Sequence, residues 1–286
     1  MVNAATAKGA ETADTTMNVA AEGAQNPCGN CPGHCCSENL INLCGYDAWL
    51  IATGLSVEPT SFLAFAQMGI DSPYHFRLDS SEEAYCLAMN MRQQPDGSRH
   101  CVFLMELPDG QTRCGIYDLR PIACRAYPLA LTDEGVDVKP WAMCPDSYIA
   151  PSGPDVDLWQ RELERHDMEF SIYALAVQTW NRNVMGQPRL RELNFRPFLG
   201  FLMDVYGRLE PARKAVPEES WPLIWSRWRR FTAEGLDPLL ARADDSQAEE
   251  GWQGWLHEIR KAVTDSAELF GANRVESSDI CKETLV

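Results

Sequence analysis

The chain has 286 residues, which is enough for one large domain or two modest domains with apolar cores of their own. Its formal net charge of −16 argues against nucleic-acid binding, because that function needs a basic surface to neutralise phosphates. The sequence shows neither a secretory signal peptide nor the roughly 18 consecutive apolar residues of a membrane span, so we expect a cytoplasmic protein with no membrane segment.

Residues 1–26 are small, polar and aperiodic, and we predict a disordered tail there. A group of closely spaced cysteines follows at once, and its members are Cys28, Cys31, Cys35 and Cys36. In a reducing cytoplasm, clustered cysteines indicate a metal site or catalysis in place of disulfides. Thiolates are soft ligands that suit Zn(II), Cu(I) and iron–sulfur clusters, so the chain is predicted to hold a metal centre.

The adjacent pair Cys35 and Cys36 bears on the kind of centre. Neighbouring side chains are expected to diverge by about 100° on a helix or about 180° on a strand, which makes it hard for both to reach one ion. Either the two thiols serve different metal atoms or one of them only packs. The pair therefore favours a cluster or two sites over a single zinc finger. The spacing also differs from the bacterial ferredoxin run C-x2-C-x2-C-x3-C-P.

Helix signals follow the first cysteines. Asp47 is expected to be the N-cap of a short helix over 48–53 that Gly54 closes. A second helix is expected to begin at Thr60 or Ser61.

Two Pro-Asp-Gly turn signals, at 95–97 and 108–110, separate three segments of strand character. These segments, 84–91, 100–107 and 111–117, predict a three-stranded antiparallel meander.

Four further cysteines are distributed around this meander. Cys101 falls on its second strand, Cys114 on its third, Cys124 just inside a helix that Pro121 opens, and Cys144 in a loop. All four could converge at one end of a small sheet. His34 and His100 each adjoin a cysteine, so they are either substitute ligands or ordinary loop histidines. Two other cysteines lie in apolar stretches and are expected to be buried small hydrophobes: Cys44 and Cys86.

The character of the chain changes at a Pro/Gly/Ser linker over Pro151–Pro154. Apolar residues beyond it recur at helical spacing in four segments, which are 155–182, 190–209, 221–231 and 252–270. The sequence therefore predicts an α+β protein. A small cysteine-rich metal-binding domain over 27–150, with the short meander and helices, precedes a mainly helical domain over 151–275 and a tail over 276–286.

The cysteine pattern resembles the YkgJ-type cysteine-cluster family. The resemblance rests on Cys-x2-Cys-x3-Cys-Cys at 28–36, on His100-Cys101, on Cys144-Pro145, and above all on the run Tyr-Asp-Leu-Arg-Pro-Ile-Ala-Cys-Arg-Ala-Tyr-Pro at 117–128. Members of the family are described as zinc- or iron-chelating and are often labelled iron–sulfur oxidoreductases. Flagellin lysine-N-methylase shares the signature. The resemblance covers about residues 28–148 and implies eight metal ligands, which are Cys28, Cys31, Cys35, Cys36, Cys101, Cys114, Cys124 and Cys144.

Two arginines of the same motif, Arg120 and Arg125, are candidate cofactor-binding residues. Several thiolates leave a metal centre negatively charged, and a guanidinium can donate hydrogen bonds to sulfur or offset that charge. The alternative is that these arginines pair with carboxylates such as Asp118.

Three functions remain open. The favoured one is a cytoplasmic protein that uses an iron–sulfur cluster, such as a [4Fe–4S] centre, in a redox or enzymatic role, because eight cysteines exceed the four ligands of one tetrahedral site. The second is a structural zinc module whose helical domain binds a protein partner. The third is a protein-lysine N-methyltransferase, which the resemblance to flagellin lysine-N-methylase implies.

Overall fold

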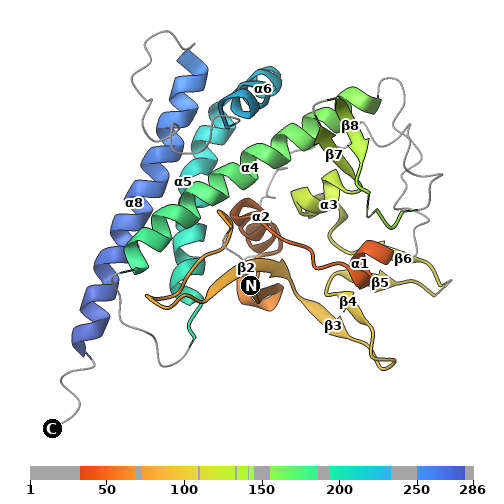
Figure 1. Ribbon diagram of the computed structural model, residues 1–286, viewed down its shortest axis with the longest axis horizontal. Helices are drawn as coiled ribbons and strands as arrows, with labels where there is room; N and C mark the ends of the chain where they lie inside the picture. Colours follow the sequence, from red (N-terminus) through yellow and green to blue (C-terminus); the bar gives the residue numbers. More distant parts are fainter. Residues whose placement is uncertain are drawn as a thin grey trace, which may run out of the picture.

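The computed structural model describes residues 33–68, 72–108, 110–132, 134–140, 142–144, 155–185, 193–232 and 250–280. The predicted N-terminal tail, Cys28, Cys31, the linker over 151–154 and Cys281 lie outside the described residues. Figure 1 shows the short strands and short helices of the cysteine-rich half gathered beside a group of long helices. The expected α+β class is confirmed.

The described strands form antiparallel pairs. They are β1 (Leu63–Met68) with β2 (Ala84–Met89), β3 (Met91–Gln93) with β4 (Arg99–Cys101), β5 (Leu104–Glu106) with β6 (Thr112–Cys114), and β7 (Leu129–Thr132) with β8 (Gly135–Val138). Both predicted turns are therefore confirmed as hairpins, and their glycines have the positive φ that the turns require, 87° at Gly97 and 81° at Gly110.

The predicted single three-stranded sheet is wrong, because β2 pairs with β1 and not with β4. The prediction of a helix from Thr60 or Ser61 is also wrong, because residues 63–68 form the strand that pairs with β2. Only the 3-10 turn η3 (Pro59–Ser61) forms there, and the following residues make strand β1. A short apolar run fits a strand as well as a helix, and here the wholly buried strand β2 decides between them by supplying the partner.

Helix α2 (Gly45–Leu55) begins three residues earlier than expected. Its N-cap is Cys44, and Asp47 occupies the third helical position, where it completes a capping box. Nor does Gly54 close the helix, because Ser56 at φ 54° is the C-cap. A Cβ on Gly54 would lie 2.7 Å from Cδ1 of Leu119, so the glycine serves close packing.

The remaining helices are α1 (His34–Glu38), η4 (Tyr117–Leu119), α3 (Ile122–Ala126), α4 (Asp155–Val184), α5 (Arg196–Ala215), η6 (Glu218–Ser220), α6 (Trp221–Thr232) and α8 (Glu250–Ile280). Helix α4 crosses the molecule from β7 and α3 to the long helices α5 and α8 (Figure 1). Helices α4, α6 and α8 confirm three of the four predicted helical segments, whereas the helix expected over 190–209 begins at Arg196 and ends at Ala215.

One apolar cluster spans both sides of the predicted boundary near residue 150, from Ile41 to Ala267. Helix α2 lies at the contact between the two sides. Gly45 lies against the buried ring of Tyr206 on α5, and Tyr46 Oη accepts a hydrogen bond of 3.1 Å from Arg165 on α4. The buried carboxylate of Glu169 on α4 pairs with Arg213 on α5.

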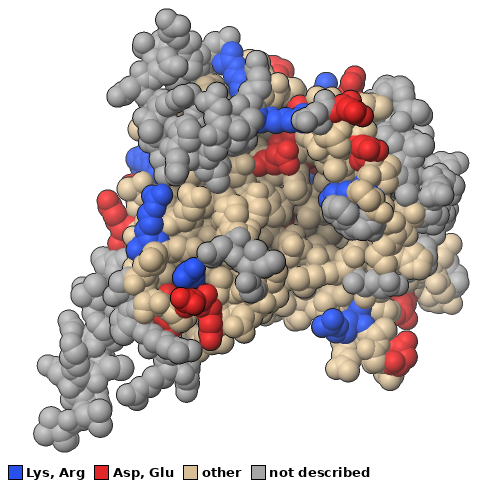
Figure 2. Space-filling view, viewed as in Figure 1, with Lys and Arg blue, Asp and Glu red and all other residues tan. Residues whose placement is uncertain are grey.

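No helix among the described residues is long and apolar enough to cross a membrane. On the face drawn in Figure 2, acidic and basic side chains of the described residues are scattered and do not form a continuous basic patch.

The contact between α2 and α5 predicts the effect of one substitution. In Gly45→Ala the added Cβ would lie 2.3 Å from Cε2 of Tyr206, which is 1% exposed and has no room to retreat. Overpacking of this kind costs about 1–3 kcal/mol of unfolding free energy, which urea denaturation measures. The control is Gly254→Ala on α8, where an added Cβ meets nothing within 4 Å. There we expect a gain of up to about 1 kcal/mol from helix propensity. Equal stability of Gly45→Ala and the wild type would contradict the packing described.

Candidate metal centre

Helix α1 presents Cys35 and Cys36 to the strand pairs beside it. The helix follows Gly33, which has a φ of 79° that strains other residues, and a Cβ there would make a tight contact of 3.1 Å with Oγ1 of Thr112. Glycine therefore lets α1 approach the β5–β6 hairpin. Helix α1 also packs on β4, the strand that ends at Cys101 (Figure 1).

Three other predicted ligands come from neighbouring elements. Cys101 ends β4, Cys114 ends β6, and Cys124 lies in the middle of α3. A negative charge on Cys35 raises the pKa of each of these three thiols, and Cys101 and Cys124 act in the same way on Cys36. The structure thus brings five of the eight predicted ligands into one neighbourhood.

The sulfur atoms of the adjacent residues Cys35 and Cys36 lie closer together than their neighbouring positions predict. Sγ of Cys35 and Sγ of Cys36 lie 3.9 Å apart. Two thiolates that bind one tetrahedral ion at about 2.3 Å would have their sulfurs about 3.8 Å apart. Adjacency in sequence therefore does not prevent this pair from sharing an ion, because the two side chains turn toward each other from the single turn of α1.

The thiols differ in how readily they ionise. The hydrogen bond from Cys36 lowers the pKa of Cys35 to about 7, and the positive charge of Arg120 acts in the same direction. The same hydrogen bond between the two thiols raises the pKa of Cys36, and burial raises it further. Burial also raises the pKa values of Cys101, Cys114 and Cys124. A bound cation lowers these raised pKa values, because a thiol that coordinates a metal gives up its proton to the solvent. The donor set therefore fits a thiophilic metal.

The two candidate arginines occupy different places. The charge of Arg120 lowers the pKa values of Cys35, Cys114 and Cys124, so its guanidinium is near enough to act on these thiols. The same guanidinium lies over the ring of Tyr117, with Cζ 4.1 Å from the ring centroid.

Arg125 instead donates to backbone carbonyl oxygens, at 3.1 Å to Arg120 and at 3.0 Å to Asp118. It therefore braces the turn between η4 and α3. A direct role of either arginine toward a cofactor stays a prediction.

Cys144 is connected to this region through Tyr127. The phenol oxygen of Tyr127 accepts a hydrogen bond of 2.6 Å from the amide of Met143. Burial raises the pKa of Tyr127, and charges on both Cys144 and Cys35 raise it further. The phenol of Tyr127 thus contacts the segment that precedes Cys144 and lies within electrostatic reach of Cys35.

Among the described residues, which leave out Cys28 and Cys31, no three histidine, cysteine or acidic side chains stand close enough together to hold a metal ion. The predicted ligand assignment therefore stays a prediction as a whole, although five of its members share a neighbourhood. None of the eight described cysteines forms a disulfide.

The two cysteines outside the predicted set have other partners. Cys44 is wholly buried and its thiol donates to Oδ2 of Asp47 at 3.4 Å, whereas Cys86 donates to Oδ1 of Asn42 at 3.8 Å. His100, weighed as a substitute ligand, has its Nδ1 3.5 Å from Oε1 of Glu106. One connection here is not visible in the sequence pattern. Asp47, expected only as a helix cap, also accepts a hydrogen bond from Ile122, two residues before Cys124.

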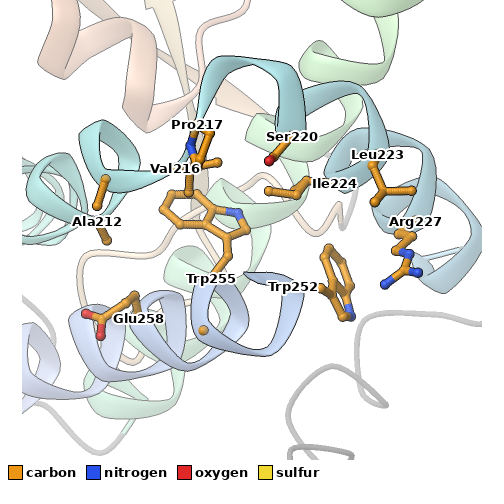
Figure 3. Close-up of a pocket in the computed structure, with 12 residues that line it drawn as sticks. Ala212, Val216, Pro217, Ser220, Leu223, Ile224, Arg227, Trp252, Trp255 and Glu258 are labelled. Atoms are coloured by element: carbon orange, nitrogen blue, oxygen red, sulfur yellow. The ribbon is translucent and has the colours of Figure 1, made fainter. Parts of the chain in front are cut away.

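A cavity of about 610 Å³ lies in the helical half, between the end of α5, helix α6 and the start of α8 (Figure 3). Trp252 and Trp255 line it together with the exposed side chain of Leu223, and Arg227 and Glu258 bring opposite charges to its wall. No cysteine is among the described residues that line it. This cavity is therefore separate from the thiols.

Comparison with known proteins gives one match, in the cysteine-rich half. Searches of curated proteins and of solved structures found no match. The model of the CxxCxxCC family, described as "Putative zinc- or iron-chelating domain", matches residues 27–145. This span includes all eight predicted ligands and every element that carries the described ones. Residues 27–145 of this chain are therefore similar to the CxxCxxCC domain, and the long helices follow them.

Proposed function

We propose that the thiols of residues 28–144 hold an iron–sulfur cluster and that the protein uses it in a redox or enzymatic role in the cytoplasm. The observation that carries this proposal is that four thiols, those of Cys36, Cys101, Cys114 and Cys124, lie within electrostatic reach of Cys35. Five thiols exceed the four ligands of one tetrahedral ion, and Cys28, Cys31 and Cys144 add to the surplus.

The charge of Arg120 supports a redox role. Its guanidinium favours negative charge on three of the thiols. Hydrogen bonding, net charge and exposure around the sulfurs set the potential of a cluster. A cation in this place stabilises the reduced, more negative state, so Arg120 would raise the reduction potential.

The first prediction concerns the metal itself. Protein purified without oxygen, and without an affinity column that removes metal, is expected to be brown and to contain iron and acid-labile sulfide in near-stoichiometric amounts. Metal analysis, sulfide analysis and an absorption spectrum measure this directly. Zinc without sulfide would contradict the cluster and leave metal binding intact.

The second prediction concerns the ligands. Cys114→Ser is expected to lose most of its metal and to lower the unfolding midpoint of the domain, because metal binding to such sites contributes directly to folding free energy. The matched control is Cys86→Ser, the same change at a buried strand cysteine whose thiol contacts Asn42. The control should keep its metal. Full metal content in Cys114→Ser would remove Cys114 from the ligand set.

A structural zinc module is the second candidate, and one distance favours it. The 3.9 Å between the sulfurs of Cys35 and Cys36 is close to the separation of about 3.8 Å for two thiolates on one tetrahedral zinc ion. In that case the metal would stabilise the small hairpins, and the helical half would recognise a protein partner. The cavity bordered by the exposed Leu223 is the part of the helical half that suits such contact. The metal and sulfide analysis above separates the two candidates.

A further inference from the structure

The carboxylate of Asp47 is wholly buried, yet in the described part of the chain no cationic side chain pairs with it. A buried charge of this kind is costly unless hydrogen bonds compensate it. Asp47 receives such bonds from two parts of the chain. Oδ2 accepts from the amide of Cys44 at 3.1 Å and from its thiol at 3.4 Å, and Oδ1 accepts from the amide of Ile122 at 2.8 Å.

The bonds to Cys44 belong to the capping box of α2 and need only one oxygen. The bond to Ile122 joins residues 75 positions apart and has no role in α2. Ile122 is the first residue of α3, whose N-cap, Pro121, makes no side-chain cap. The first amides of a helix lack partners within the helix. Asp47 therefore supplies from a distant helix the cap that the sequence of α3 lacks.

Helix α3 has five residues, and its central residue is Cys124. A helix this short has little stability of its own. The amide of Cys124 is bonded at 2.9 Å to the carbonyl oxygen of Pro121, so the position of Cys124 follows the position of the first turn. Fixing the amide of Ile122 thus fixes the place from which the thiol of Cys124 reaches the other thiols.

We propose that Asp47 is a positioning residue for the metal centre, whose buried carboxylate anchors α3 to α2 and holds Cys124 in place before metal arrives. This inference rests on the proposed metal binding by the cysteines and does not depend on whether the metal is iron or zinc. Partners of this kind, one contact beyond the ligands, typically change metal affinity by about 10–100-fold when they are replaced.

The test uses the full-length protein with the metal it carries after purification. In Asp47→Asn the amide keeps one acceptor oxygen and places an NH2 group where the second acceptor was, so it cannot accept from both backbone amides. The concentration of EDTA that removes half of the metal in a fixed time is expected to fall by about 10–100-fold.

Two variants serve as controls. Glu169→Gln changes another wholly buried carboxylate, one that pairs with Arg213 and is not bonded to α3. It should lower the thermal midpoint yet release metal at the wild-type EDTA concentration. Cys44→Ala removes the thiol donor to Asp47 and keeps the bond to Ile122, and it should also behave as wild type in EDTA.

A second measurement needs no variant. In wild-type protein stripped of metal, the amide of Ile122 is expected to stay protected from hydrogen exchange, because its bond to Asp47 does not require the metal. This measurement keeps the inference testable if Asp47→Asn fails to fold.

Three results would overturn the inference alone: unchanged EDTA sensitivity of Asp47→Asn, equal sensitivity of Glu169→Gln, or rapid exchange of Ile122 in the stripped protein. Wild-type protein that carries no metal would instead overturn the proposed function itself.

Discussion

Crowded thiols resist ionisation, and the cysteine-rich half has to overcome that resistance before it can bind a metal. Burial raises the pKa values of Cys101, Cys114 and Cys124, and any charge on Cys35 raises them further. Arg120 opposes this repulsion with one positive charge, whereas a metal ion opposes it with more. Metal binding and the ordering of these segments are therefore linked, because the thiols tolerate their negative charge best around the ion.

The cysteine-rich half also needs support from outside its strand pairs. Strands of three residues, as in β3, β4, β5 and β6, cannot form a stable sheet of their own. The support comes from α2, which lies between the strand pairs and the long helices and contributes Asp47 toward α3 and Gly45 toward α5. The arginines of α4 and α5 continue this support, with Arg165 bonded to Tyr46 and Arg213 stacked on the same ring at 4.4 Å.

Local patterns in the sequence were sufficient for part of this structure. The Pro-Asp-Gly turns, the long amphipathic helices and the strand positions of Cys101 and Cys114 follow from residues close together in the chain. The partner of β2 could not be predicted, because strand pairing depends on residues distant in sequence and the segment of Phe65 suits a helix equally well. The second role of Asp47 was hidden for the same reason, since its bond to Ile122 crosses 75 positions.

For the candidate site, too, only part of the arrangement could be predicted from the sequence. Spacing and residue type indicated which cysteines belong together, and the structure places five of them in one neighbourhood. The separation of the sulfurs of Cys35 and Cys36 was misjudged, because the orientation of a side chain on a single helical turn depends on its rotamer as well as on the backbone.

The two hairpin turns have a consequence for how such a domain can diverge. An added Cβ at Gly97 or Gly110 meets nothing within 4 Å, so there is open space beside both glycines. The pairing of β3 with β4 and of β5 with β6, not the length of the turns, places Cys101 and Cys114. The length of these tips can therefore vary during evolution while the thiols keep their places, but the positive φ of Gly97 and Gly110 still favours glycine at both positions. Change at Gly33 has no such freedom, since α1 touches the neighbouring hairpin there.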